Sequence, residues 1–449
     1  MIIRDKKNKT TFQISTLGCK VNQYDSAVLK NLLLSGNFIL PKKDKNLDLI
    51  IINSCSVTSS AITKARRLLS SLTKDNPKAK TVLIGCWPKV YNIEGLKVDF
   101  IFNNKDLFIL AKKIESIFSG ADPNKIFELN DKKAISQGGA IQQSSCLKLN
   151  LIDDRSRYFI KIQDGCRQFC SYCVIPLARG PLNSRPSLDI IKEIRLATND
   201  GFSEIVLSGI HLGLYGKDFL NKSENLYSLL LKILKIKNIG RIRLSSIEVS
   251  EISDDIINLI SKNRKMCRHL HIPLQAGSNR ILSLMNRPYN IKFFEDKINK
   301  IRKKVPDISI TTDIIVGFPG ESDKDFKETY NFSKRIKFSK IHVFSFSAHE
   351  KTPAYFLPDR VAREEIKSRS LKLRQLSKKM ENEYKIKIMD SHPDLEIVIE
   401  GSKGEKIRAK TEFYFDIIIP KKYLEKKHLK SLSQRKLNSL VGKKIIYKS

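Results

Sequence analysis

Short β-rich apolar runs alternate with longer amphipathic stretches over residues 1–125. Three of these runs lead into a cysteine: Thr11 to Leu17 into Gly18-Cys19, Asp48 to Asn53 into Ser54-Cys55, and Thr81 to Ile84 into Gly85-Cys86. The alternation is typical of a parallel sheet with crossover helices. We therefore expect an N-terminal α/β domain in which each cysteine follows a strand.

The carboxyl ends of parallel strands share one edge of the sheet, so side chains just beyond them converge. Spacings of 36 and 31 residues separate Cys19, Cys55 and Cys86, about one βα unit each. A single cysteine at such a place is more often a buried small residue. Three cysteines in register, two of them preceded by glycine, favour a shared site over that alternative.

Between Lys125 and Arg157 the pattern gives way to polar, Gly- and Ser-containing sequence, which predicts a linker at 126–156. Cys146 lies inside it without a partner motif, and we assign it no role. Beyond the linker, strand-like runs followed by helical patterns recur at Tyr158–Gln163, Glu204–Ser208, Arg241–Ser246, Arg268–Leu274, Ser309–Gly317 and Lys340–Ser347. Eight such units close a barrel, so six predict a partial (β/α)6 barrel over 157–388 with its chemistry at the carboxyl ends of the strands.

After a basic helical stretch, Arg360 to Met389, the pattern becomes β-like again, which predicts a small β-barrel over 389–449. It carries a basic series from Lys421 to Lys448 and aromatics at Phe413, Tyr414 and Phe415. A small barrel with basic and aromatic side chains is a plausible RNA platform. A solvated Lys-rich surface explains the same segment equally well.

The net charge of +35 would ordinarily indicate a nucleic-acid partner. Lys, Ile and Asn are abundant from end to end, as a genome-wide mutational bias would produce, so charge alone decides little. Eight unevenly spaced cysteines do not fit a secreted disulfide scaffold, and reduced thiols fit a cytoplasmic protein. The N-terminus has no apolar core of signal-peptide length, and the longest apolar stretches are far short of the ~20 residues that span a bilayer. We expect no membrane insertion.

The most specific local motif is D-G-C-R-Q-F-C-S-Y-C, in which Cys166, Cys170 and Cys173 have the spacing C-x3-C-x2-C directly after the first barrel strand. A structural zinc site needs four ligands. No fourth Cys or His lies within local reach, and Cys267 and His211 could contribute only through the fold. A 4Fe-4S cluster held by three thiolates keeps one iron open to a substrate or cofactor, which favours iron over zinc.

This spacing resembles the signature of the radical S-adenosylmethionine (SAM) enzymes. The resemblance implies a partial barrel and a cluster whose open iron is chelated by SAM, so that one electron cleaves SAM to a 5'-deoxyadenosyl radical. It places Tyr172, the aromatic before the last cysteine, against adenine. Further candidate SAM contacts at strand ends are Ser208, Gly209, Ser245, Ser246, Glu248, Gln275, Gly277 and Asp313. A turn or packing role explains each single residue about equally well.

A three-cysteine domain ahead of such a barrel, with a small β tail, resembles the methylthiotransferases over nearly the whole chain. The segments that carry the resemblance are T-L-G-C-K-V-N-Q-Y-D-S (Thr16 to Ser26), N-S-C-S-V-T (Asn53 to Thr58) and G-C-W-P-K (Gly85 to Lys89). By residue matching, Cys19, Cys55 and Cys86 would hold an auxiliary 4Fe-4S cluster. The tail would correspond to the family's RNA-binding TRAM β-barrel.

Three subfamilies act on isopentenyladenosine in tRNA, on threonylcarbamoyladenosine in tRNA, and on an aspartate of a ribosomal protein. Four segments resemble the threonylcarbamoyladenosine group. They are the sequence around Cys19, R-L-S-S-I-E (Arg243 to Glu248), H-L-H-I-P-L-Q-A-G-S (His269 to Ser278) and M-N-R-P-Y (Met285 to Tyr289). The run A-R-G-P-L-N-S-R-P (Ala178 to Pro186) leans toward the ribosomal-protein group. His349 and Lys351 also depart from the pattern, and the tail matches its barrel pattern poorly.

The implied reaction methylthiolates carbon 2 of the modified adenosine at position 37, beside the anticodon of tRNA. It consumes two SAM, one as a methyl donor to sulfur on the auxiliary cluster and one as the radical source. A low-potential electron donor is a further implied partner. The sequence assigns no general acid or base. A non-enzymatic alternative, a zinc-containing RNA-binding module, stays open at this point.

Overall fold

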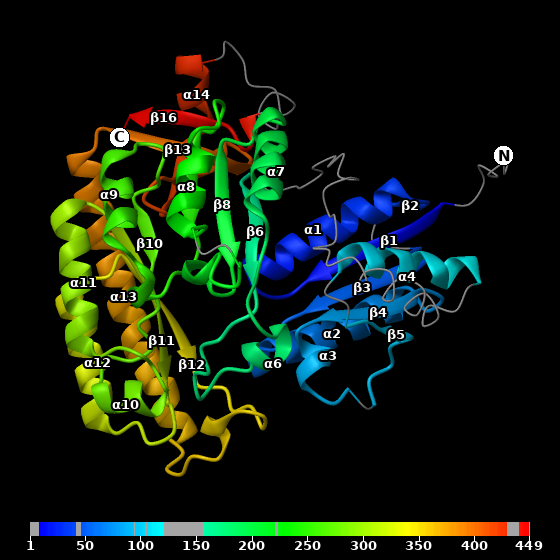
Figure 1. Ribbon diagram of the computed structural model, residues 1–449, viewed down its shortest axis with the longest axis horizontal. Helices are drawn as coiled ribbons and strands as arrows, with labels where there is room; N and C mark the ends of the chain where they lie inside the picture. The colour runs from blue at the N-terminus through cyan, green and yellow to red at the C-terminus, as the bar shows by residue number, and fades with distance from the viewer. Residues whose placement is uncertain are drawn as a thin grey trace. The chain divides into compact units, whose positions relative to one another are not determined.

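The computed structural model describes residues 9–41, 46–93, 95–103, 106–120, 156–220, 223–428 and 440–448. The chain forms two compact units, one of residues 1–152 with 177–180 and one of residues 153–176 with 181–449 (Figure 1). Apart from Ser156, the predicted linker lies outside the described residues, and so does Cys146. In the described part of the chain, no helix has both the length and the apolar character needed to cross a membrane.

The first unit is built on a five-stranded parallel sheet with the order β2-β1-β3-β4-β5. Its strands are β1 (Thr10–Thr16), β2 (Phe38–Ile39), β3 (Leu49–Ser54), β4 (Lys80–Gly85) and β5 (Phe100–Ile101). Its helices are α1 (Lys20–Ser35), α2 (Ser59–Asp75), α3 (Trp87–Val90) and α4 (Leu107–Ser119). The three predicted strands are β1, β3 and β4, and the expected parallel sheet is confirmed.

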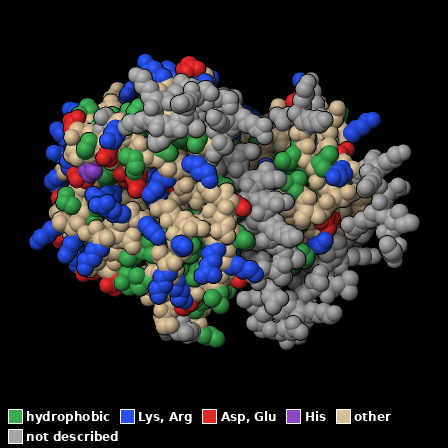
Figure 2. Space-filling model, turned by 90° about the horizontal axis from the view of Figure 1, so that it is seen from above, with side chains coloured by type: hydrophobic (Ala, Val, Ile, Leu, Met, Phe, Trp, Pro, Cys, Tyr) green, Lys and Arg blue, Asp and Glu red, His purple; other side chains and the backbone are tan. Residues whose placement is uncertain are grey.

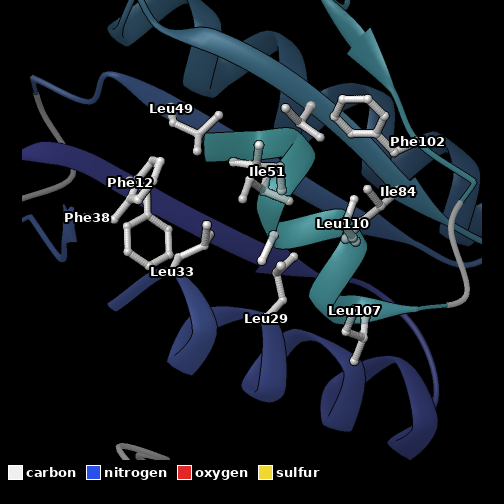
Figure 3. Packing of buried hydrophobic residues seen from close by; sticks show 13 residues of the cluster. Phe12, Leu29, Leu33, Phe38, Leu49, Ile51, Ile84, Phe102, Leu107 and Leu110 are labelled. Atoms are coloured by element: carbon white, nitrogen blue, oxygen red, sulfur yellow. The ribbon is translucent and has the colours of Figure 1, made fainter. Parts of the chain in front are cut away.

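Strand β3 is buried along its whole length because helices cover both faces of the sheet. Leu49 and Ile51 pack on one face, in a cluster with side chains of α1 and α4. Figure 3 shows Ile51 of that cluster together with Leu29 of α1 and Leu110 of α4. Ile50 and Ile52 alternate to the other face, in a cluster with side chains of α2. This two-sided burial fixes the strand and therefore the place where it ends, at Cys55.

The second unit contains six parallel strands in two hydrogen-bonded groups, β7-β6-β8-β9 and β10-β11-β12. Isolated bridges between Ile242 and Met266 and between Ser246 and His271 join the two groups. The parallel strands are β6 (Tyr158–Asp164), β8 (Glu204–Gly209), β9 (Arg241–Leu244), β10 (His269–His271), β11 (Ser309–Val316) and β12 (Lys340–Ser345). The short β7 (Asn183–Ser184) is antiparallel to β6. All six predicted runs form strands, which confirms the open, partial barrel.

Helices follow most of these strands, as Figure 1 shows for the segments from green to orange. They are α6 (Ile175–Arg179), α7 (Ser187–Asn199), α8 (Leu226–Leu234), α9 (Asp254–Lys262), α10 (Asn279–Leu284), α11 (Ile291–Lys304), α12 (Asp323–Ile336) and α13 (Arg363–Ser391). The predicted basic helical stretch is α13, which packs on β12 and β11. Lysines and arginines are scattered over the face seen in Figure 2 and not gathered in one stripe.

The tail is a four-stranded antiparallel sheet with the order β15-β14-β13-β16. Its elements are β13 (Asp394–Lys403), β14 (Lys406–Thr411), β15 (Asp416–Pro420), α14 (Lys421–His428) and β16 (Lys444–Lys448). Phe413 and Phe415 are not available as the exposed aromatics of an RNA platform, because they are 1% and 6% exposed within the tail's own core. So small a sheet needs large side chains to fill its single apolar face. Tyr414 instead stacks on His269, with 4.3 Å between ring centroids.

The tail is fastened to the amino ends of the barrel strands. Arg241 donates to the carbonyls of Glu396 (2.8 Å) and Lys410 (2.9 Å), while its Nε donates to Glu204 (2.5 Å). Arg243 in the same way joins Glu204 to the carbonyl of Thr411 (3.0 Å). Burial alone would raise the pKa of Glu204. The two guanidiniums lower it by more than burial raises it, so the pKa lies well below its usual range. The carboxyl ends of the strands are left for chemistry.

Candidate functional site

The first cysteine triad stands at the carboxyl edge of the five-stranded sheet. Cys19 precedes α1 as its N-cap residue, Cys55 directly follows β3, and Cys86 is the N-cap residue of α3. Helix N-termini favour thiolates because the aligned peptide dipoles leave partial positive charge there. Burial, with a smaller contribution from the nearness of Cys86 and Cys19, raises the pKa of Cys55 to about 11. The structure therefore brings the three predicted thiols together.

Two glycines make this convergence possible. Gly85 has φ +99°, and a Cβ there would stand 2.4 Å from the carbonyl oxygen of Ser54. Gly18 has φ +140°, and a Cβ there would stand 3.1 Å from the Cβ of Cys55. Both conformations are strained for any residue with a side chain. The glycines before Cys19 and Cys86 thus let neighbouring backbones approach closely enough to share a site.

A buried polar network ties this triad to Arg179, which lies in the segment 177–180 of the first unit. Its Nε donates to Cys86 Sγ (3.2 Å), Nη2 donates to Asn22 Oδ1 (2.6 Å), and Nη1 pairs with Asp25 (3.0 Å). The same Asn22 oxygen lies 3.4 Å from Cys19 Sγ. One guanidinium therefore connects two of the three cysteines.

The second triad occupies the loop between β6 and α6. The backbone N–H of Cys173 donates to the carbonyl of Cys170 (3.0 Å), which folds the loop into a turn. Burial, with a smaller contribution from the neighbouring Cys170 and Cys166, raises the pKa of Cys173 to about 12. Burial also raises the pKa of Cys170, which Arg287 opposes. The three predicted thiols of this motif are again close neighbours.

Two cationic or titratable side chains contact the sulfurs of this second triad. Arg287 Nη1 donates to Cys170 Sγ (3.1 Å), and its Nη2 pairs with the carboxylate of Glu248. His211 Nδ1 lies 3.3 Å from Cys166 Sγ. Burial lowers the pKa of His211, but its contacts with Cys166 and Glu251 raise it more, to about 10.

The candidate SAM residues fit a polar ligand at this edge. The hydroxyls of Ser208 and Ser245 are buried without a hydrogen-bond partner in the described part of the chain, as expected of groups that await one. Gly209 keeps the backbone open, since a Cβ there would meet Gln163 Oε1 at 3.1 Å. Arg287 links Glu248 to the triad, and Tyr172 lies beside Cys170.

Gln275 is half-buried after β10 with φ +69°, and a β-bridge pairs it with Ile314. Asp313 faces His271 at 3.1 Å, whereas Gly277 packs under α12, where a Cβ would come 2.5 Å from Thr329 Cα. These two positions therefore have evident packing or pairing roles. Glu248 is joined to the cysteines through Arg287, which contacts both the Glu248 carboxylate and Cys170 Sγ.

The donor set of each triad consists of thiols, which are the ligands that hold 4Fe-4S clusters. Among the described residues, no group of three or more His, Cys, Asp or Glu side chains could hold one metal ion. Each triad also offers three thiols and not the four closed ligands of structural zinc.

Sequence reasoning named His211 only as a residue that the fold could bring to the second triad, and the structure places it there. It gave no role to the other side chains around the sulfurs, which are Asn22, Arg179, Glu251 and Arg287. Arg287 lies within the M-N-R-P-Y segment, and Arg179 lies in the run that seemed only a departure from the pattern. No local spacing relates either of them to a cysteine. Their partners are more than 90 residues away in the chain, so only the fold reveals the contacts.

Comparison with known proteins identifies two family regions in the chain. Residues 160–333 match the Radical SAM superfamily, and residues 11–103 match the Uncharacterized protein family UPF0004. A protein of Bacillus subtilis (strain 168) named threonylcarbamoyladenosine tRNA methylthiotransferase MtaB is 35% identical over 83% of this chain and 82% of its own length. A protein of Carboxydothermus hydrogenoformans named tRNA-2-methylthio-N(6)-dimethylallyladenosine synthase is 34% identical over 80% and 81%.

A solved structure shares the fold. The radical S-adenosylmethionine methyltransferase TsrM from Kitasatospora setae aligns with a TM-score of 0.56 and 15% identity, covering 77% of each chain. At that identity the likeness concerns the fold alone. It agrees with a parallel-sheet unit joined to a partial barrel in one chain.

Proposed function

This chain belongs to the radical SAM methylthiotransferases, and from that premise we propose that it methylthiolates carbon 2 of N6-threonylcarbamoyladenosine at position 37 of tRNA. Relatives named for this substrate are 33–37% identical over 83–92% of the chain. Relatives named for dimethylallyladenosine reach 32–34%. The sequence segments around Cys19 and Met285 support the first substrate over the second.

The observation that carries the proposal is the presence of two thiol triads, each at the carboxyl edge of a parallel sheet. We assign Cys166, Cys170 and Cys173 to the radical cluster and Cys19, Cys55 and Cys86 to the auxiliary cluster. When bound, SAM and the two 4Fe-4S clusters supply a methyl group, one-electron cleavage of SAM and the sulfur to be transferred. The triads would therefore have unequal work.

The chain's own residues would bind and orient SAM beside the second triad. The free hydroxyls of Ser208 and Ser245 are available donors, and Gly209 and Gln275 offer backbone at strand ends. Tyr172 would supply an apolar face. Glu248, held by Arg287, would accept hydrogen bonds from ligand hydroxyls. Burial of these groups would keep water from the reacting atoms.

The partners that follow are the anticodon stem-loop of tRNA and an unidentified low-potential electron donor. Reduced thiols and a tRNA substrate both fit a cytoplasmic protein. A net charge of +35 supports a phosphate-rich partner without locating its surface.

Nucleoside analysis of bulk tRNA from a deletion strain tests the substrate. We expect the methylthio derivative of threonylcarbamoyladenosine to disappear while its unmethylthiolated parent accumulates, and complementation to restore it. Loss of the dimethylallyl (isopentenyl) derivative instead would select that second substrate. Unchanged tRNA nucleosides with a methylthiolated ribosomal-protein aspartate missing would overturn the tRNA assignment altogether.

Anaerobic purification tests the cofactors independently of the substrate. The expected protein is brown with about eight irons, four for each cluster. A colourless protein that contains zinc would favour the non-enzymatic RNA-binding module.

A further inference from the structure

His211 is wedged between a cysteine sulfur and a carboxylate at the end of β8. Its side chain is 5% exposed, with Nδ1 3.3 Å from Cys166 Sγ and Nε2 2.5 Å from Glu251 Oε1. Groups that contact metal ligands orient those ligands and tune the metal centre, and carboxylate–histidine pairs are common among them. Here the imidazole contacts the ligand atom and is not itself counted among the ligands.

The position of His211 is fixed by Gln163, which is fully buried at the end of β6. The backbone N–H of His211 donates to Gln163 Oε1 (2.7 Å), and Gln163 Nε2 donates to the carbonyl of Gly165 (2.8 Å), the residue before Cys166. One amide side chain therefore holds both the histidine backbone and the start of the cysteine loop. The contact between His211 and Cys166 is built and not incidental.

Gly213 makes room for the carboxylate on the other side. A Cβ at this position would lie 2.2 Å from Glu251 Oε2 and 2.5 Å from Glu251 Cβ. Any larger residue would push Glu251 away from the imidazole. Glu251 Oε2 has no hydrogen-bond partner among the described residues, and Glu251 Oε1 lies 2.5 Å from His211 Nε2, so the carboxylate faces the imidazole.

The chemistry of Cys166 and His211 determines which of them donates the hydrogen bond once a cluster is bound. A thiolate ligand only accepts, so a hydrogen bond between Cys166 Sγ and His211 Nδ1 has to be donated by the imidazole. A hydrogen bond to a ligand sulfur draws negative charge away from the iron, which stabilises the reduced cluster. Such a contact therefore raises the reduction potential.

We propose that His211, oriented by Glu251, is a positioning residue of the radical cluster that donates a hydrogen bond to the sulfur of Cys166 and eases one-electron reduction. The proposal rests on the proposed function, since it takes Cys166 as a cluster ligand. Glu251 acts through the histidine, and Gly213 admits Glu251.

The test uses the full chain with Cys19, Cys55 and Cys86 all replaced by alanine, so that only the second triad can bind a cluster. Into this triple variant we would introduce His211→Phe, which removes the ring nitrogens. A second variant, Gly213→Ala, displaces Glu251 and keeps the imidazole. His392→Phe is the matched control, because His392 also faces a carboxylate, Asp307 at 3.7 Å, in the tail junction. Readouts are iron content, the midpoint potential followed by electron paramagnetic resonance, and reductive cleavage of SAM.

We expect His211→Phe to shift the midpoint potential to more negative values and to slow SAM cleavage about tenfold, the size typical of a lost supporting contact. Gly213→Ala should shift the potential in the same direction by less. His392→Phe should match the parent. If His211→Phe fails to assemble a cluster, Gly213→Ala decides the matter: a more negative potential supports the proposal, and an unchanged one overturns it.

Unchanged potential in His211→Phe at full iron content would also overturn the proposal. Failure of the parent itself to bind iron would instead count against the assignment of Cys166, Cys170 and Cys173. The two failures are therefore distinguishable.

Discussion

Cys19, Cys55 and Cys86 come from three loops and are separated by 36 and 31 residues, whereas Cys166, Cys170 and Cys173 lie within eight residues of one loop. The first triad exists only when β1, β3 and β4 pair in register, because each thiol takes its place from the end of a different strand. The second triad lies in one short segment, but the side chains that contact its sulfurs, His211 and Arg287, are distant in the sequence. Long-range sheet packing thus makes the first site, while long-range side chains tune the second.

The largest expected effect separates the work of the two triads. Cys170→Ala should abolish SAM cleavage, because it removes a proposed ligand of the radical cluster. Cys19→Ala should leave SAM cleavage in place and abolish methylthio transfer. The measurements are 5'-deoxyadenosine formed and methylthiolated nucleoside formed. Equal loss of cleavage in both variants would contradict the division.

Gly85→Ala tests whether the first triad depends on sheet geometry. The new Cβ would clash with Ser54 at 2.4 Å in a left-handed conformation, so we expect loss of about four irons. Backbone strain alone should destabilise the protein by about 1–3 kcal/mol. Gly404→Ala is the control, since Gly404 has φ +58° but nothing within 4 Å of the added Cβ. Iron analysis and thermal unfolding are the measurements, and full iron content in Gly85→Ala would refute the dependence.

Alkylation of the cluster-free protein compares the thiols within the first triad. Cys19 is exposed, whereas Cys55 is buried with its pKa raised from 9.0 to about 11. A raised thiol pKa lowers the thiolate fraction at pH 8, here about a hundredfold, and the thiolate is the reacting form. Cys19 should therefore react with iodoacetamide far sooner than Cys55, and Cys55 should accelerate as the pH rises toward 11. Equal rates at pH 8, read by peptide mass spectrometry, would show that the cluster-free triad is not packed as described.

The sequence predicts features that are encoded in short segments and does not predict contacts between side chains that are distant in the chain. Strand ends and cysteine spacing are encoded in short stretches, so β1, β3, β4, the six barrel strands and both triads could be predicted. The neighbours of the sulfurs could not, because Arg179 reaches Cys86 across 93 residues and Arg287 reaches Cys170 across 117. The sequence also could not decide the role of the aromatic residues at Phe413 and Phe415. Alternating aromatic positions occur both in exposed stacking surfaces and in cores, and only the packed sheet shows that these two side chains point inward.

Arg179 offers the finest test, because it is the long-range side chain that the first triad does possess. Arg179→Gln should keep bulk near Asn22 but lose the charge and the fork of donors that reach Cys86 and Asp25. We expect methylthio transfer to fall about tenfold with SAM cleavage unchanged, as for other lost supporting contacts. Arg195→Gln, at an exposed position of α7, is the control. If methylthio transfer by Arg179→Gln equalled that of the control, sheet geometry alone would suffice for the first triad. Only the second triad would then depend on side chains that are distant in the sequence.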